Sequence, residues 1–216
     1  MTKKKLDAGA IDINKLVEAL ECEQGDYKLP DPATFNFYWY ADRRKLWIDM
    51  EVDASIVEFE RMILRWNLQD SGKPPEEREP IWIYLMNYGG DADMMWSMVD
   101  IIELSETPIY TVNMGNCSSA AAIIFIAGKK RFMMPGAKVM IHEGSGEFEG
   151  DATKVLDHAA AYKAMLARMN KFILDHTNIQ PRMLSKKRSN DWEIDAKTCL
   201  EYGVCDVIPK SLNDIL

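Results

Sequence analysis

Ser119 is the residue of this chain best suited by its surroundings to act as a nucleophile. It lies in the small-residue stretch 115–122, directly ahead of the apolar run 123–128. A nucleophilic serine is usually presented at a tight strand-to-helix turn whose small neighbours let a substrate backbone approach. The alternative is a buried helix start, at which the Ser119 hydroxyl only caps the first turn.

A general base and an orienting carboxylate would complete this chemistry. Of the three histidines, His142 is the best candidate base, because it ends the apolar segment 139–141, where a side chain can project into a cleft. Asp191 lies between two expected helices and is the candidate carboxylate. By spacing alone, His142 is equally explained as a hydrogen-bonded core residue.

Hydrolysis at Ser119 would also need backbone donors for the developing oxyanion. Gly89 and Gly90 end the strand that precedes the strand of Ser119, and a glycine turn can leave an N–H, here that of Gly90, facing the cleft. The N–H of Ala120, at the expected helix start, is the second candidate donor.

The other nucleophiles and histidines have simpler interpretations. Cys117 has no basic neighbour in sequence to activate it and is expected to be a packed thiol. Ser118 is expected to point away from the turn. His158 fits a surface or an interface, and His176, near a helix C-terminus, is explained by the helix dipole.

Composition narrows the function classes. The chain has 216 residues, of which 47% are apolar, and a net charge of −8, which argues against nucleic-acid binding. Its longest apolar run, residues 120–127, is far below the roughly 20 residues of a membrane span. We therefore expect a soluble, cytoplasmic protein without a membrane partner.

No cofactor or metal is expected either. The four cysteines show no CxxC spacing, which disfavours zinc sites and a disulfide framework. The acidic loop 143–151 is interpreted as solvated, and the chain contains no P-loop.

Alternating strand and helix patterns predict an α/β domain with mainly parallel pairing. Residues 1–33 are interpreted as an N-terminal extension, partly helical behind Asp12, and residues 34–216 as the main domain. Residues 34–40 are expected to be extended. Strands are expected at 46–48, 81–86, 109–114, 132–134, 139–141 and 204–208, and helices at 55–69, 93–104, from 119, 152–176, 181–189 and 195–202.

Several motifs in one order carry a family resemblance. Residues 83–90 (IYLMNYGG) look like the Y-I-N-S-P-G-G turn, and 114–128 like the nucleophile segment, of the Clp protease proteolytic subunit, ClpP. Residues 131–142 (RFMMPGAKVMIH) match its K-R-x-x-L-P-N-S-R-V-M-I-H stretch, and 196–206 follow its C-terminal pattern. Overall, residues 43–209 resemble this family.

The resemblance implies a ClpP/crotonase-like spiral of βαβ units with a long protruding handle helix. It places Ser119, His142 and Asp191 on the catalytic triad, and the N–H groups of Gly90 and Ala120 on the oxyanion hole. The loop containing Gly144 and Gly146 would pair with an extended substrate backbone.

The expected activity is ATP-dependent Clp-type serine endopeptidase activity on peptides or unfolded proteins. The expected assembly is a homo-oligomeric ring, a heptamer that can stack as a tetradecamer, with a separate AAA+ unfoldase. Trp82, Tyr84 and Phe132 fall where the family has apolar docking clefts for that unfoldase, but a core or subunit-interface role explains them equally.

Departures from the family pattern leave alternatives open. Tyr88 replaces a proline in the oxyanion-side turn, Met95 replaces a glycine in the following helix, and Asn190 replaces an arginine associated with ring stacking. One alternative is a weakly active or non-catalytic ring subunit. Others are a phage-type processing protease and a crotonase-type acyl-CoA enzyme, which would need no triad.

Overall fold

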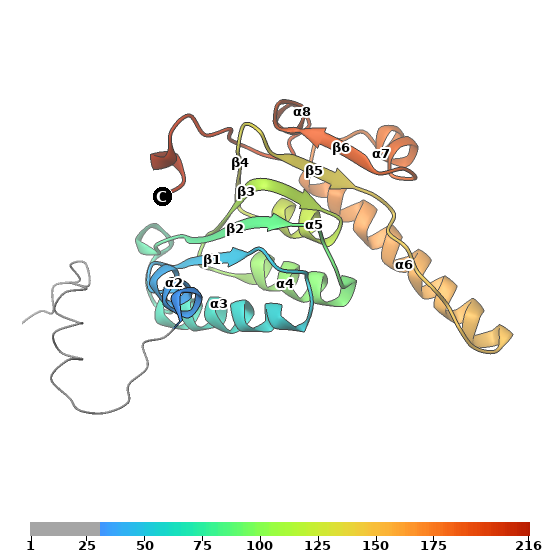
Figure 1. Cartoon of the computed structure of the whole chain (residues 1–216), viewed down its shortest axis with the longest axis horizontal. Coiled ribbons are helices and arrows are strands. Elements are labelled where there is room, and N and C mark those ends of the chain that lie inside the picture. Colours follow the sequence, from blue (N-terminus) through green and yellow to red (C-terminus); the bar gives the residue numbers. More distant parts are fainter. Residues whose placement is uncertain (1–30) are drawn as a thin grey trace, which may run out of the picture. The chain divides into compact units, whose positions relative to one another are not determined.

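The structure is a computed structural model that describes residues 31–216 (Figure 1). The helix expected behind Asp12, and Cys22, lie outside the described residues. The chain divides into two compact units, Met1–Tyr38 and Trp39–Leu216. All candidate site residues belong to the second unit.

The element order confirms most of the expected strands and helices. The strands are β1 (Lys45–Ile48), β2 (Ile81–Asn87), β3 (Ile109–Ser118), β4 (Lys130–Met133), β5 (Lys138–Ile141) and β6 (Trp192–Asp195). The α-helices are α2 (Pro32–Ala41), α3 (Val57–Gln69), α4 (Ala92–Leu104), α5 (Ala120–Ala127), α6 (Ala152–His176), α7 (Pro181–Lys187) and α8 (Ala196–Glu201). Short 3₁₀ turns occur at Ala54–Ile56, Pro75–Glu77 and Leu212–Asp214.

The strands form one six-stranded sheet in the order β1-β2-β3-β5-β6, with β4 pairing to β3. All pairs are parallel except β5 with β6. The β1-α3-β2, β2-α4-β3 and β3-α5-β4 connections are successive βαβ units, which confirms the predicted α/β class and agrees with the fold that the resemblance implies. The first turns of α6 extend past the sheet (Figure 1).

The two faces of the sheet carry different side chains because alternate residues of a strand point to opposite sides. Ile81, Ile83 and Leu85 of β2 are fully buried in the main core, which α3, α4 and α5 cover. Trp82 and Tyr84 belong to a separate aromatic cluster on the other face. The parallel core orients the C-terminal ends of β2 and β3 toward one edge, where Gly90 and Ser119 follow.

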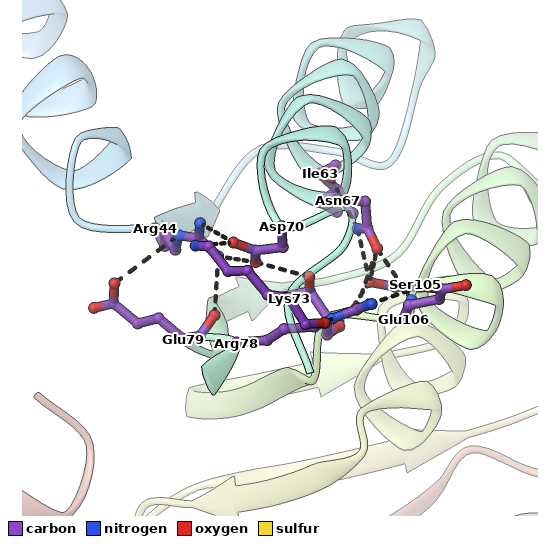
Figure 2. Close-up of polar contacts among 10 residues, drawn as sticks. Arg44, Ile63, Asn67, Asp70, Lys73, Arg78, Glu79, Ser105 and Glu106 are labelled. Atoms are coloured by element: carbon purple, nitrogen blue, oxygen red, sulfur yellow. Dashed lines mark hydrogen bonds and ion pairs between the residues drawn. The ribbon is translucent and has the colours of Figure 1, made fainter. Parts of the chain in front are cut away.

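A cluster of charged residues around the buried Asp70 lies at the end of the sheet opposite to Gly90 and Ser119 (Figure 2). Asp70, which is fully buried, receives two hydrogen bonds from the Arg44 guanidinium, at 2.5 and 2.8 Å, one from Lys73 and one from the Thr107 hydroxyl. Arg44 and these other donors hold the pKa of Asp70 well below its usual range. The cluster ties the end of α3 to the starts of β1 and β3.

The expectation of an extended segment at residues 34–40 was wrong. These residues belong to α2, which begins at Pro32. The Asp31 carboxylate accepts the N–H groups of Ala33 and Thr34, and proline is favourable in a first helical turn. This local capping outweighs the strand preference of the aromatic residues that follow.

The C-terminal region also differs from the prediction. Residues 204–208 do not form a strand, because only Val207 makes an isolated bridge, to Phe132. The sequence pattern missed β6, a four-residue strand that lies between α7 and α8 and pairs antiparallel with β5. This strand brings residue 191 toward the end of β5.

Candidate active site

Ser119 occupies the single residue between β3 and α5. Its backbone is in an uncommon conformation, with φ 54° and ψ −124°. Its side chain makes no capping hydrogen bond, so the alternative role as a helix cap does not hold. Instead, Ser119 Oγ lies 2.8 Å from His142 Nε2, within hydrogen-bond distance.

The two residues before Ser119 face the interior. Ser118 Oγ is buried and donates a hydrogen bond to Asn116 Oδ1 at 3.0 Å. Cys117 is fully buried, and burial raises the pKa of its thiol well above the usual value. Neither side chain is therefore presented as a nucleophile, and the hydroxyl of Ser119 is the one that meets the imidazole.

The other side of the His142 ring faces Asp191. Asp191 Oδ1 lies 3.4 Å from His142 Nδ1, which is an ion-pair distance but long for a hydrogen bond. The Asp191 side chain is 75% exposed and that of His142 is 27% exposed. The structure thus brings the three residues proposed from the sequence together in one row, with the looser contact at the carboxylate.

Gly89 packs closely against Ser119, and Gly90 packs closely against Val52. A Cβ on Gly89 would lie 2.7 Å from Ser119 Cβ, and one on Gly90 would lie 2.8 Å from Val52 N. Both glycines have positive φ, 108° and 149°. Only glycine fits these two positions, and the turn lies directly against the start of α5.

Side-chain amides hold this turn in place. Asn87 Oδ1 accepts the Gly89 N–H at 2.7 Å, and Asn87 Nδ2 donates to the Met50 carbonyl. Asn116 Nδ2 donates to the Asn87 carbonyl at 3.1 Å. Tyr88, which replaces the proline of the family pattern, directs its side chain into solvent with 77% exposure. The turn is fixed by these amides rather than by a proline ring.

A pocket of about 180 Å³ opens beside Ser119 Oγ. Gly90, Ala120, His142 and Gly144 line it, which places both candidate oxyanion donors at the same cavity as the hydroxyl. Its apolar walls come from two helices: Ala92 and Met95 of α4, and Tyr162, Met165 and Met169 of α6. Gly146 is not among the pocket residues, and it packs instead near Phe148 and Tyr162.

The remaining histidines have structural contacts. His176 Nε2 lies 2.8 Å from Glu103 Oε1, and its ring stacks on Phe172. His158, which belongs to α6, lies near the ring of Phe148, a residue of the preceding loop. Within residues 31–216, no group of three or more His, Cys, Asp or Glu side chains could hold a metal ion. In that same range, no helix is both long and apolar enough to cross a membrane.

Sequence reasoning missed several residues that shape this site. Asn87 and Asn116 were not singled out, although an asparagine that ends a strand next to a glycine turn is a signal for side-chain bonding to the backbone. Glu143, Arg188 and Tyr162, which meet just beyond His142, were also missed. No local pattern marks them, because they lie on three separate segments.

The fold and the site together define a class. Successive βαβ units bring the Ser119 hydroxyl, the His142 imidazole and the Asp191 carboxylate into one row beside a pocket, an arrangement compatible with a hydrolase. Residues 72–211 match the family described as Clp protease. The chain belongs to the Clp protease family, as the resemblance predicted, and this membership implies a peptidase.

Two relatives support the same assignment. The ATP-dependent Clp protease proteolytic subunit 2 of Treponema denticola is 36% identical over 139 residues, which cover 63% of this chain and 70% of that protein. The protein of the same name from Treponema pallidum is 30% identical over 128 residues, which cover 58% of this chain and 64% of that protein. The family match begins after α3, so β1 and α3 lie outside it.

Proposed function

We propose that this protein is a serine endopeptidase that cleaves peptides or unfolded proteins with Ser119, His142 and Asp191. The observation that carries the proposal is the 2.8 Å contact between Ser119 Oγ and His142 Nε2, two residues that line the same pocket. A hydroxyl held against an imidazole at this distance can lose its proton as it attacks a carbonyl.

In the first half-reaction, Ser119 Oγ bonds to the carbonyl carbon of the substrate while His142 takes the hydroxyl proton. His142 then gives this proton to the leaving amine, the C–N bond breaks, and an acyl-enzyme remains. In the second half-reaction, water attacks the ester, with His142 again as base, and releases the acid and the free Ser119 hydroxyl. Asp191 orients the imidazole and stabilises its charged form.

We assign the oxyanion site to the N–H groups of Gly90 and Ala120. Ala120 begins α5, and the first N–H groups of a helix have no acceptor within the helix. Asp91 N and Val52 N, rather than Gly90 N, form the hydrogen bonds of the neighbouring bridge. Both donors border the pocket that holds Ser119, where they can bind a developing negative charge.

The pocket indicates the substrate side chain that would lie next to the cleaved bond. Methionines from α4 and α6 form the apolar part of its wall, against which an apolar substrate side chain would pack. The Glu143 N–H is not free to pair with an extended substrate, because it donates to the Arg188 carbonyl, and the Glu143 carbonyl already accepts the Tyr162 hydroxyl. Substrate pairing would therefore begin at Gly144, and we retain Gly144 and Gly146 as the substrate-binding loop.

We further propose that the chain assembles into a ring, a heptamer that can stack as a tetradecamer, and receives unfolded substrates from an AAA+ partner. Trp82 and Phe132, with Tyr110 and Lys130, line an open groove of about 420 Å³ on the aromatic face of the sheet. An apolar partner segment would fit there. Tyr84, in contrast, is buried and donates a hydrogen bond to the Ile215 carbonyl, which favours a core role for it.

The direct test is covalent labelling of the purified protein with a fluorophosphonate probe, combined with a peptide-hydrolysis assay. The wild-type chain should be labelled at residue 119, and Ser119→Ala should lose both labelling and hydrolysis. Ser118→Ala is the matched control, because its hydroxyl bonds Asn116 inside the protein. Undiminished labelling of Ser119→Ala would refute the proposal, and a wild-type chain without hydrolysis would favour a non-catalytic ring subunit.

A further inference from the structure

Glu143, the residue after His142, is held through its backbone N–H and carbonyl by hydrogen bonds and through its carboxylate by an ion pair. Its N–H donates to the Arg188 carbonyl at 3.0 Å, and its carbonyl accepts the Tyr162 hydroxyl at 2.8 Å. Its carboxylate oxygen Oε1 lies 3.0 Å from Arg188 Nε. Three segments, the end of β5, the middle of α6 and the end of α7, therefore meet at one residue.

This junction lies beside both partners of the proposed His142–Asp191 pair. Glu143 directly follows His142, and Arg188 stands three positions before Asp191 in the turn that leads into β6. The next residue, Gly144, has φ 76°, so the chain turns sharply after Glu143 and passes near the Tyr162 hydroxyl. The backbone that carries the imidazole is thus fixed from α6 by a single hydroxyl.

We propose that Tyr162 is a positioning residue, whose hydroxyl acts through the Glu143 carbonyl to keep His142 aligned between Asp191 and Ser119. The inference rests on the proposed function, and it adds a residue of α6 to those that determine the rate of peptide hydrolysis. His142 Nδ1 and Asp191 Oδ1 are already 3.4 Å apart. Any further displacement of the His142 backbone would therefore break the contact between the imidazole ring and the carboxylate. Tyr162 itself touches no reacting atom in this scheme.

The hydroxyl and the ring of Tyr162 have separable roles. The ring lines the pocket beside Ser119, and the hydroxyl proton is committed to Glu143. Tyr162→Phe therefore removes the hydrogen bond to the Glu143 carbonyl and leaves the ring in the pocket wall. A matched control is Tyr40→Phe on α2, because the Tyr40 ring packs against Trp39 and Trp47 and its hydroxyl has no hydrogen-bond partner within residues 31–216.

The experiment measures peptide hydrolysis and the rate of fluorophosphonate labelling for the full chain. For Tyr162→Phe we expect both kcat and the labelling rate to fall about tenfold, a change comparable with the net contribution of about one hydrogen bond. KM should stay within about twofold of wild type. Tyr40→Phe should match wild type in all three quantities. A raised KM with unchanged kcat, or an unchanged labelling rate, would overturn the inference.

A double-mutant cycle with Asp191→Ala tests the route of the effect. If Tyr162 acts by aligning His142 with Asp191, Tyr162→Phe should slow labelling less than twofold once Asp191 is absent. Equal slowing in both backgrounds would show that Tyr162 acts elsewhere and would contradict the proposal. Failure of the proposed function would look different from failure of this inference. In that case Ser119→Ala would still be labelled, both with tyrosine and with phenylalanine at residue 162.

Discussion

His142 and Asp191 lie on the rung that follows the last pair of the β5–β6 ladder. The antiparallel register pairs Ile141 with Trp192, so the next positions outward are His142 and Asp191, whose Nδ1 and Oδ1 atoms are 3.4 Å apart. Paired positions of an antiparallel ladder direct their side chains to the same face. One short strand pair therefore aligns two residues from distant parts of the chain.

The first prediction concerns the carboxylate on this rung. Asp191→Asn should lower kcat by about a hundredfold, less than the roughly 10⁴-fold loss known for a fully buried triad aspartate, because Asp191 is exposed and its contact is long. Glu193→Gln, which removes an exposed carboxylate of β6 that pairs with Lys138, is the control and should leave kcat unchanged. An unchanged kcat in Asp191→Asn would remove this residue from the mechanism.

The second prediction concerns the depth of the pocket. Met95 is 1% exposed and forms part of the wall that α4 contributes beside Ser119. Met95→Ala should enlarge the pocket and raise the ratio of kcat/KM for substrates with a large aromatic side chain over those with a small aliphatic one by about tenfold. This ratio does not depend on the fraction of folded enzyme.

Met98→Ala is the matched control for the pocket variant. Met98 is equally buried on the same helix but does not line the pocket, so its loss should destabilise the fold by about 2–5 kcal/mol without a change in substrate preference. If Met98→Ala shifted the ratio as much as Met95→Ala does, the pocket would not be the origin of the preference.

The third prediction concerns the amide that holds the glycine turn. Asn87→Ala removes the acceptor of the Gly89 N–H and the donor to the Met50 carbonyl. We expect kcat to fall about a hundredfold, because the Gly90 N–H would no longer be fixed at the oxyanion position. Asn67→Ala removes a comparable set of amide hydrogen bonds at the other end of the sheet and should cost stability but not kcat of the folded enzyme.

The fourth prediction concerns the buried cluster around Asp70. Asp70→Asn leaves Arg44 without its buried partner and should lower the free energy of unfolding by about 3–5 kcal/mol near neutral pH. The pKa of Asp70 is lowered in the folded state, so the ionised carboxylate stabilises the fold above its ordinary pKa, and this stability is lost as the pH falls through the folded-state pKa.

Urea denaturation at several pH values measures this effect. The stability difference between wild type and Asp70→Asn should be full near pH 7 and should shrink below about pH 4, the ordinary range of an aspartate. Glu79→Gln, at an exposed carboxylate 4.0 Å from Arg44, should change stability by less than about 1 kcal/mol. A difference between wild type and Asp70→Asn that grew on acidification would contradict the assignment.

The sequence alone was sufficient for most of the fold, because strong apolar periodicity marks the strands and helices of the main domain. The 152–176 helix, for example, was predicted with the observed bounds. The prediction failed where tertiary contacts decide the structure. β6 is only four residues long with one buried side chain, and it becomes a strand because β5 provides its ladder.

The candidate site was predictable to a different degree at each residue. Ser119 and His142 stand at the ends of strong strand patterns, so their positions followed from local sequence and from the family resemblance. Asp191 depends on the β5–β6 pairing, which no local pattern revealed. Tyr162 was beyond reach, because its contact with Glu143 depends on how α6 packs against the end of β5.

The backbone conformation of Ser119 makes the requirements of stability and of catalysis conflict at this position. A non-glycine residue at φ 54° and ψ −124° carries a strain of about 1–3 kcal/mol, which a glycine would relieve at an entropic cost of about 0.5–1 kcal/mol. Screening variants for heat resistance alone would therefore favour glycine at residue 119 and discard the hydroxyl. Any programme that stabilises this protein needs to keep serine fixed there and seek its gains in other parts of the sheet.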